Sequence, residues 1–241
     1  MLFGLVSFHA QAGEVRVAVA SNFAAPMARL AALFQQQSVH TVKVSPGSSG
    51  KLHAQIQNGA PFDVLLAADE KIPVLLEHEG LAVSGTRFVY ALGKLVLWSA
   101  KPGFVDDKGA VLGKGGFGKL AYADPKLAPY GLAAKETLDA MRLWGKVQGK
   151  MVTGENIAQT YQFAATGNAE LAFIALSQVY KDGKVMEGSW WRVPSSLYSP
   201  IRQSAVQLSG AKDKVAAQAF LIFMKSSKAA AVILSFGYEL P

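Results

Sequence analysis

The stretch from Glu14 to Phe34, EVRVAVASNFAAPMARLAALF, decides the fold class. Over residues 15–19 valine occupies every second position, which is the period of a strand with one well-buried face. The next two residues, Ser21 and Asn22, are of the types that cap helix starts. Apolar residues then recur at the spacing of one helical face, at Phe23, Met27, Leu30 and Phe34. The stretch therefore predicts a strand, a polar turn and a helix.

The same order of elements repeats along the chain. Strands are predicted over 42–44 and 62–67, with a turn over 46–50 and a short helix over 52–58 between them. Later elements alternate in the same way. Apolar runs that predict strands lie at 90–98, 120–123, 171–175 and 205–208. Helical patterns lie at 130–143, 157–165 and 213–236, and the last of these is broken near 226–227. This alternation predicts an α/β architecture with largely parallel sheets.

Composition excludes several classes of protein. Of the 241 residues 51% are apolar and 17% charged, and no run of 18 apolar residues is present, which indicates a soluble globular chain. The net charge of +7 comes from singly scattered Lys and Arg without a nucleic-acid motif, so we expect no nucleic-acid partner. The absence of cysteine excludes disulfides, thiol chemistry and a lipid anchor on an N-terminal cysteine.

Residues 1–12 form an apolar stretch that ends in Ala10-Gln11-Ala12, a small-x-small pattern typical of signal-peptide cleavage. The stretch lacks the basic residues that normally begin a signal peptide. We expect a signal-peptide remnant, an exported protein and a mature chain that begins near Gly13; the alternative is a frayed apolar terminus.

No pattern of a catalytic or metal site is convincing. The glycine-rich segment 113–119 resembles nucleotide-binding motifs, but a strand rather than a helix follows it, and the residue after Lys119 is Leu120, so a surface loop is predicted. The four histidines are widely spaced, and paired carboxylates such as Asp106-Asp107 are interpreted as solvated loop charges. We therefore expect neither an enzyme nor direct protein ligands to a metal ion.

Hydroxyl and amide residues do recur where a helix is expected to follow a strand, at Ser21-Asn22 and at Ser48-Ser49. A helix start has unpaired backbone N–H groups and about half a positive charge, so several converging starts can hold an anion. Ordinary helix capping is the alternative for each of them.

Five segments taken together resemble the periplasmic molybdate-binding proteins of ABC transporters, and their order and spacing match from Glu14 to the end of the chain. They are Ala18-Val19-Ala20-Ser21-Asn22-Phe23, Pro46-Gly47-Ser48-Ser49-Gly50-Lys51-Leu52, Gly59-Ala60-Pro61-Phe62-Asp63-Val64, Ala123-Asp124-Pro125 with Pro129-Tyr130-Gly131-Leu132-Ala133-Ala134-Lys135, and Phe236-Gly237-Tyr238.

The resemblance implies a two-lobed type II periplasmic binding protein fold, with mixed, mostly parallel sheets flanked by helices and a ligand cleft between the lobes. Lobe one is expected to be discontinuous, over 13–88 and 202–241, and lobe two to span 89–201. The chain would cross between the lobes near 86–93 and near 198–204.

Carried over to this sequence, the resemblance implies an oxyanion site. Ser21 and Ser49 match two hydroxyl ligands, and Asn22 matches an amide donor of some members. Tyr130 stands where many members have a small residue that donates its backbone N–H, and Ile157 matches an apolar residue that does the same.

One departure concerns a tyrosine that several members place after the strand over 171–174. This chain has Ala175 there. The side chain of Tyr130 is expected either to supply the missing contact or to face the hinge.

The expected ligand is molybdate or tungstate, a dianion without a proton to donate, so its ideal site contains only hydroxyl, amide and N–H donors. The metal would be held as this oxyanion, without a cofactor. The expected protein is a periplasmic monomer that delivers the ligand to the permease of an ABC transporter in the inner membrane. Alternatives are a sulfate or phosphate binder, an enzyme acting on a phosphorylated small molecule, and a two-lobed sensor domain.

Overall fold

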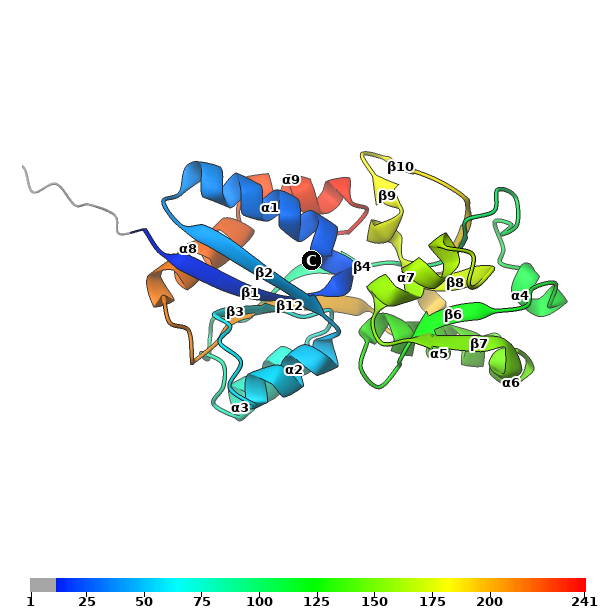
Figure 1. Cartoon of the computed structure of the whole chain (residues 1–241), viewed down its shortest axis with the longest axis horizontal. Helices are drawn as coiled ribbons and strands as arrows, with labels where there is room; N and C mark the ends of the chain where they lie inside the picture. Colours follow the sequence, from blue (N-terminus) through cyan, green and yellow to red (C-terminus); the bar gives the residue numbers. More distant parts are fainter. Residues whose placement is uncertain (1–11) are drawn as a thin grey trace, which may run out of the picture.

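The computed structural model describes residues 12–241, which fold around two five-stranded sheets placed side by side (Figure 1). Each sheet contains two parallel and two antiparallel pairings, and helices cover both of its faces. The predicted α/β class with mixed sheets flanked by helices is confirmed, but the expectation of largely parallel sheets is wrong, because half of the strand pairings in each sheet are antiparallel. The expected signal peptide, residues 1–12, lies outside the described residues except for Ala12.

The first sheet has the order β2-β1-β3-β12-β4. Its strands are β2 (Thr41–Gly47), β1 (Glu14–Ala20), β3 (Val64–Leu66), β12 (Ile201–Gln207) and β4 (Phe88–Gly93). Its helices are η1 (Ser21–Phe23), α1 (Ala24–Gln37), α2 (Ser49–Gln57), α3 (Lys71–His78), α8 (Lys214–Met224) and α9 (Ser227–Ser235). The valines of β1 pack against α1, α8 and α9, whereas Ala18 faces α2 and α3 on the other side. The alternation seen in the sequence thus divides the strand between two cores.

The second sheet has the order β11-β5-β8-β6-β7. Its strands are β11 (Ser189–Arg192), β5 (Leu95–Ser99), β8 (Leu171–Ala175), β6 (Leu120–Ala123) and β7 (Met151–Gly154). Two helices, α5 (Pro129–Ala140) and α7 (Ile157–Ala165), cover its opposite faces. The short elements are α4 (Val111–Lys114), α6 (Trp144–Val147), η2 (Gln148–Lys150), η3 (Leu176–Gln178), β9 (Tyr180–Lys181), β10 (Lys184–Val185) and η4 (Ser195–Leu197).

The chain passes from the first sheet to the second at Lys94. The preceding strand, β4, pairs with β12 of the first sheet, and the following strand, β5, pairs with β8 and β11 of the second. The apolar run 90–98 is therefore two strands rather than one. A lobe boundary at residue 88 or 89 would cut through β4, so we propose that residues 13–93 and 201–241 form a first lobe and residues 94–200 a second lobe.

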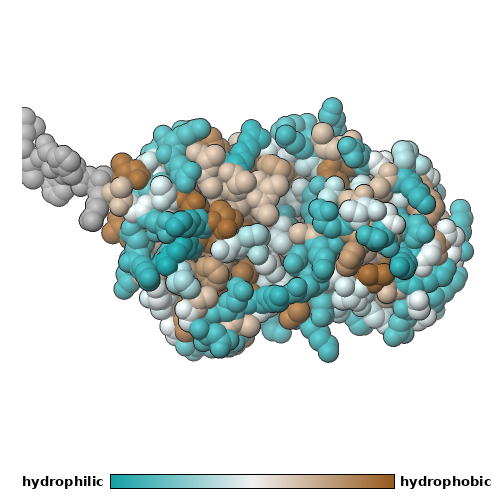
Figure 2. All heavy atoms as spheres, viewed as in Figure 1, coloured by the Kyte–Doolittle hydropathy of each residue, from teal (hydrophilic) through white to brown (hydrophobic). Residues whose placement is uncertain are grey.

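Hydrophilic and hydrophobic side chains are interspersed on the face seen in Figure 2. Over residues 12–241 no single helix is long and apolar enough to cross a membrane; α8 and α9 reach that length and hydropathy only together, with a bend of 64° between them.

Candidate functional site

One small cavity lies where four strands end, two from each sheet. Strands β1 and β2 are paired in parallel, as are β6 and β7, and a helix follows each of the four. The cavity is small and partly open to solvent, with about 10 Å³ of room for the centre of a water-sized sphere. It is lined by Ala20, Ser21, Asn22, Gly47, Ser48, Ser49, Ala68, Ala128, Pro129, Tyr130 and Ile157. The structure thus brings all five predicted residues, Ser21, Asn22, Ser49, Tyr130 and Ile157, to one place; their role in binding a ligand remains a prediction.

The hydroxyl of Ser49 is set to donate into this cavity. Ser49 begins α2 and is 1% exposed, and its Oγ accepts a hydrogen bond from the backbone N–H of Ala68 at 3.0 Å. This contact uses an acceptor position of the oxygen and leaves its proton for another partner. The neighbouring Ser48 is the N-cap of α2, where its Oγ accepts from the N–H of Lys51 at 3.4 Å. Of the two serines, Ser49 is therefore the better donor to a guest.

Asn22 contributes differently from the side-chain amide donor that the resemblance implies. Its Nδ2 donates to Gln203 Oε1 and to Tyr238 Oη, each at 2.9 Å, so both amide protons are already used. What remains is the backbone N–H, which belongs to the first turn of η1, where N–H groups have no partner within the helix. Ser21, the first residue of η1, is also buried at the cavity wall.

The side chain of Tyr130 faces the hinge between the lobes and does not replace the tyrosine that is missing at Ala175. Its Oη accepts from Gln203 Nε2 at 3.2 Å and lies over Gly93, where a Cβ would stand only 2.2 Å from the hydroxyl oxygen. Tyr130 reaches the cavity as the second residue of α5, directly after Pro129. Its unpaired backbone N–H is the group it offers there.

Ile157 is the first residue of α7. The N-cap Asn156 accepts through Oδ1 from the N–H groups of Ala158 and Gln159, at 3.0 Å each, and not from that of Ile157. The side chain of Ile157 is 2% exposed and packs in the core of the second sheet. Its backbone N–H is thus the polar group that Ile157 can present to the cavity.

The electrostatic character of the cavity comes from hydrogen-bond donors and helix starts. Among the described residues that line it, none has a charged side chain. The N-termini of four helices lie at its wall, and each carries roughly half a positive charge. No group of three or more His, Asp or Glu within residues 12–241 is arranged to hold a metal ion. The arrangement can hold a small anion without a carboxylate to repel it and without a side-chain cation.

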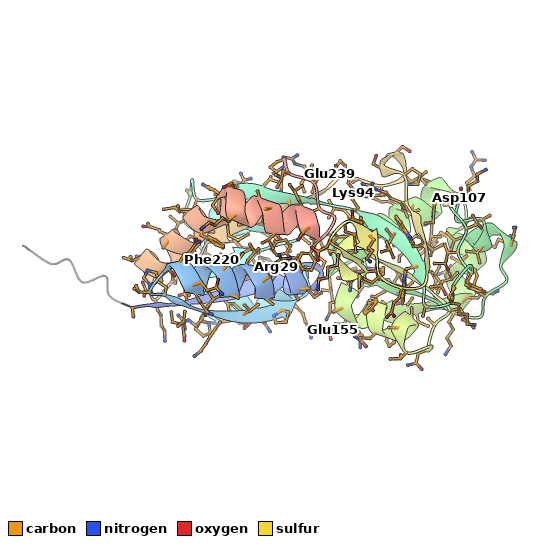
Figure 3. All side chains as sticks on the ribbon, turned by 90° about the horizontal axis from the view of Figure 1, so that it is seen from above. Arg29, Lys94, Asp107, Glu155, Phe220 and Glu239 are labelled. Atoms are coloured by element: carbon orange, nitrogen blue, oxygen red, sulfur yellow. The ribbon has the colours of Figure 1, made fainter. Side chains whose placement is uncertain are left out.

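The lobes touch each other on both sides of the cavity. On one side the N–H of Gly50 donates to the carbonyl of Leu127 at 2.9 Å, and Lys51 pairs with Glu155. On the hinge side Lys94 pairs with Glu239 at 2.7 Å. Figure 3 shows Glu155 and the Lys94–Glu239 pair at the junction of the two lobes. Both lobes therefore border the cavity and contact each other beside it.

Residues behind the cavity were missed by the sequence analysis. Gln203 and Ser177 are buried polar residues from β12 and η3, and the sequence around them carries no signal beyond apolar runs. Tyr238 did belong to a recognised segment, 236–238, but nothing in that segment indicates that its hydroxyl meets Asn22.

Burial of the tyrosines predicts a loss of stability in alkali. Burial raises the pKa of Tyr238 to about 12, and it raises the pKa of Tyr90 and Tyr130 well above the ordinary value. Above about pH 10 the unfolded chain loses these protons while the native state keeps them, so the free energy of unfolding falls between about pH 10 and pH 12. Urea unfolding across this range checks the prediction, and a free energy of unfolding that stays level would contradict it.

Comparison with known proteins gives consistent matches over nearly the whole chain. Residues 15–239 match the family model of the bacterial extracellular solute-binding proteins. The molybdate-binding protein ModA of Azotobacter vinelandii is 56% identical over 237 residues, 98% of this chain and 94% of that one. That of Rhodobacter capsulatus is 49% identical, over 95% and 89% of the two chains. The solved periplasmic molybdate-binding protein of Azotobacter vinelandii superposes with a TM-score of 0.92 and 43% identity, covering 94% of this chain and 99% of that one.

Proposed function

Because the chain belongs to the bacterial extracellular solute-binding proteins, we propose that it captures molybdate, or tungstate, in the periplasm and delivers it to the permease of an ABC transporter. It acts as a binding protein and not as an enzyme, and it works as a monomer. The observation that carries the proposal is the cavity between the lobes, whose wall offers hydroxyl and N–H donors and no charged side chain. The 56% identity to a protein named for molybdate binding supports this choice of anion.

The proposed ligands are Ser21, Asn22, Ser49, Tyr130 and Ile157. Ser21 and Ser49 would donate through their hydroxyl groups, and Asn22, Tyr130 and Ile157 through backbone N–H groups at helix starts. The metal would be held as its oxyanion, so no protein atom would coordinate it. Since each lobe supplies two of the four helix starts, a complete set of donors exists only when both lobes enclose the guest.

The character of these donors favours a proton-free dianion. Molybdate, tungstate and sulfate are fully ionised at neutral pH and need only donors. Phosphate carries at least one proton at neutral pH and gains from an acceptor, which the carboxylate-free wall does not provide. Sulfate remains the nearest alternative, because it differs from molybdate in size rather than in hydrogen-bonding character.

Thermal unfolding with each oxyanion added separately tests the proposal. A ligand present at about 100 times its Kd adds about 2.7 kcal/mol to the free energy of unfolding. We expect this gain with molybdate and tungstate at concentrations at which sulfate and phosphate have little effect. Stabilisation by phosphate alone, or by sulfate at a lower concentration than molybdate, would overturn the choice of ligand.

A further inference from the structure

Three buried polar residues, one of which lines the cavity, are linked to one another by hydrogen bonds. We call Asn22, Ser177 and Tyr238 the hinge triad; their exposed fractions are 3%, 5% and 4%. Tyr238 Oη lies 2.9 Å from Asn22 Nδ2, from the backbone oxygen of Asn22 and from Ser177 Oγ. Ser177 Oγ lies 2.9 Å from the same backbone oxygen.

The available protons allow one arrangement that satisfies every member. Tyr238 has a single proton, so it cannot donate to both of its acceptors at once. If Asn22 Nδ2 donates to Tyr238, Tyr238 donates to Ser177 and Ser177 donates to the backbone oxygen of Asn22, each hydroxyl both accepts and donates. Hydrogen bonds linked in this way strengthen one another in a buried setting.

The triad joins the two lobes at Asn22, which also lines the cavity. Asn22 and Tyr238 belong to the first lobe, although they are 216 positions apart in sequence, and Ser177 belongs to the second. Both bonds made by Ser177 therefore cross between the lobes. Separating the lobes would break these two bonds and would leave the side chain of Asn22 held only by Tyr238 and Gln203, which both belong to the first lobe.

We propose that Tyr238 is a positioning residue: its hydroxyl, together with Ser177, holds Asn22 and the start of η1 in the position that completes the donor wall when the lobes are closed. This inference rests on the proposed function of the cavity. The hydroxyl acts through Asn22 and does not touch the anion.

The ring of Tyr238 is held in place independently of its hydroxyl, so the role can be tested without moving the ring. The ring packs edge-on against Phe23, with 5.3 Å between the ring centroids. The preceding Gly237 has a φ of +78°, and a Cβ on it would lie 2.9 Å from a ring carbon of Tyr180. The following Glu239 exchanges backbone hydrogen bonds with Leu92. Tyr238→Phe thus removes one oxygen and keeps the packing.

The matched control is Tyr90→Phe. Tyr90 is 3% exposed and also packs edge-on against Phe23, at 4.8 Å between centroids. Its hydroxyl contacts Gln203 Oε1 at 3.0 Å and the carbonyl of Ala67 at 3.3 Å, both within the first lobe. This variant deletes an equally buried hydroxyl but no bond between the lobes.

The experiment measures the rates of molybdate binding and release by stopped-flow fluorescence in the wild type and in Tyr238→Phe, Ser177→Ala, the double variant and Tyr90→Phe. Since the bonds between the lobes exist only in the closed state, we expect Tyr238→Phe and Ser177→Ala each to speed release about tenfold, with the association rate within about twofold. The double variant should release molybdate at about the rate of Ser177→Ala, because Ser177→Ala already removes both bonds between the lobes. Tyr90→Phe should lower the Tm without ligand but leave the release rate within about twofold.

Other outcomes overturn distinct claims. Release from Tyr238→Phe and Ser177→Ala at the wild-type rate, or accelerated no more than in Tyr90→Phe, removes the positioning role while the proposed function stands. If the accelerations of release in the two single variants multiply in the double variant, the positioning role is also contradicted, because the two hydroxyls then act separately. A wild-type protein that binds neither molybdate nor tungstate overturns the proposed function itself.

Discussion

The variant Ser49→Asp is expected to bind molybdate at least a thousandfold more weakly than the wild type. It places a carboxylate at a residue that is 1% exposed at the wall of a cavity without other charged side chains. Two unit charges about 4 Å apart repel by about 4 kcal/mol at the effective dielectric constant of a protein, and a dianion doubles this. Since each 1.4 kcal/mol is about a factor of ten, a thousandfold loss leaves room for structural relaxation.

The smaller change Ser49→Ala separates lost attraction from added repulsion. It removes the hydroxyl and leaves the N–H of Ala68 without its partner. A lost hydrogen bond to a charged group costs about 1 to 3 kcal/mol, or about 5- to 150-fold in affinity. Isothermal titration calorimetry with molybdate measures both variants.

Ser226→Asp is the control for the added charge. Ser226 is also the serine at a helix start, where its Oγ accepts from the N–H of Ala229 at 3.2 Å, but it lies outside the cavity. Aspartate is as good an N-cap as serine, so we expect this variant to fold and to bind molybdate as the wild type does. Affinities of Ser49→Asp and Ser49→Ala that equal the wild-type value would remove Ser49 from the site.

The second large effect concerns stability: Gly131→Ala is expected to lower the free energy of unfolding by about 3 kcal/mol. Gly131 lies in the first turn of α5, pressed against the end of β6. A Cβ there would stand 2.1 Å from the carbonyl oxygen of Ala123 and 2.9 Å from the carbonyl carbon of Asp124. These neighbours are backbone atoms, so the clash is relieved only if α5 moves away from the sheet, together with the N–H of Tyr130.

Gly145→Ala is the matched control, because a Cβ at Gly145 meets no atom within 4 Å. It also lies in a helix, α6, where alanine is favoured over glycine. Thermal unfolding should give a Tm about 6 to 12 °C below the wild type for Gly131→Ala and no decrease for Gly145→Ala. Equal melting temperatures in the two variants would mean that the close approach of α5 and β6 does not limit the stability of the protein.

The fold was predictable from the sequence where periodicity and burial agree. The helical face from Phe23 to Phe34 is buried as predicted, because one stripe of α1 packs on the sheet. The run 90–98 could not be divided from the sequence. Both β4 and β5 are apolar, and only the pairing of each strand shows that Lys94 separates two sheets.

The turn predicted over 46–50 is another instructive difference. Strand β2 continues through Pro46 to Gly47, and α2 begins already at Ser49. Proline is tolerated because β2 is the edge strand of its sheet and pairs only with β1. The consequence is functional, since Ser49 becomes the first residue of a helix rather than part of a turn.

The candidate site was predictable as a set of residues but not as a set of donors. Residue types and the family resemblance pointed to five positions, and all five line the same cavity. The sequence could not show that the amide of Asn22 is used by Gln203 and Tyr238, or that Tyr130 turns its hydroxyl to the hinge. Such orientations depend on partners as far as 216 positions away, and no local pattern records them.

The most direct test of the account is a crystal structure with bound molybdate, in which anomalous scattering at the molybdenum edge locates the metal. We expect a single peak in the cavity, with oxyanion oxygens about 2.7 to 3.2 Å from the hydroxyls of Ser21 and Ser49 and from the backbone nitrogens of Asn22, Tyr130 and Ile157. A peak outside this cavity, or molybdenum coordinated directly by a side chain, would contradict it.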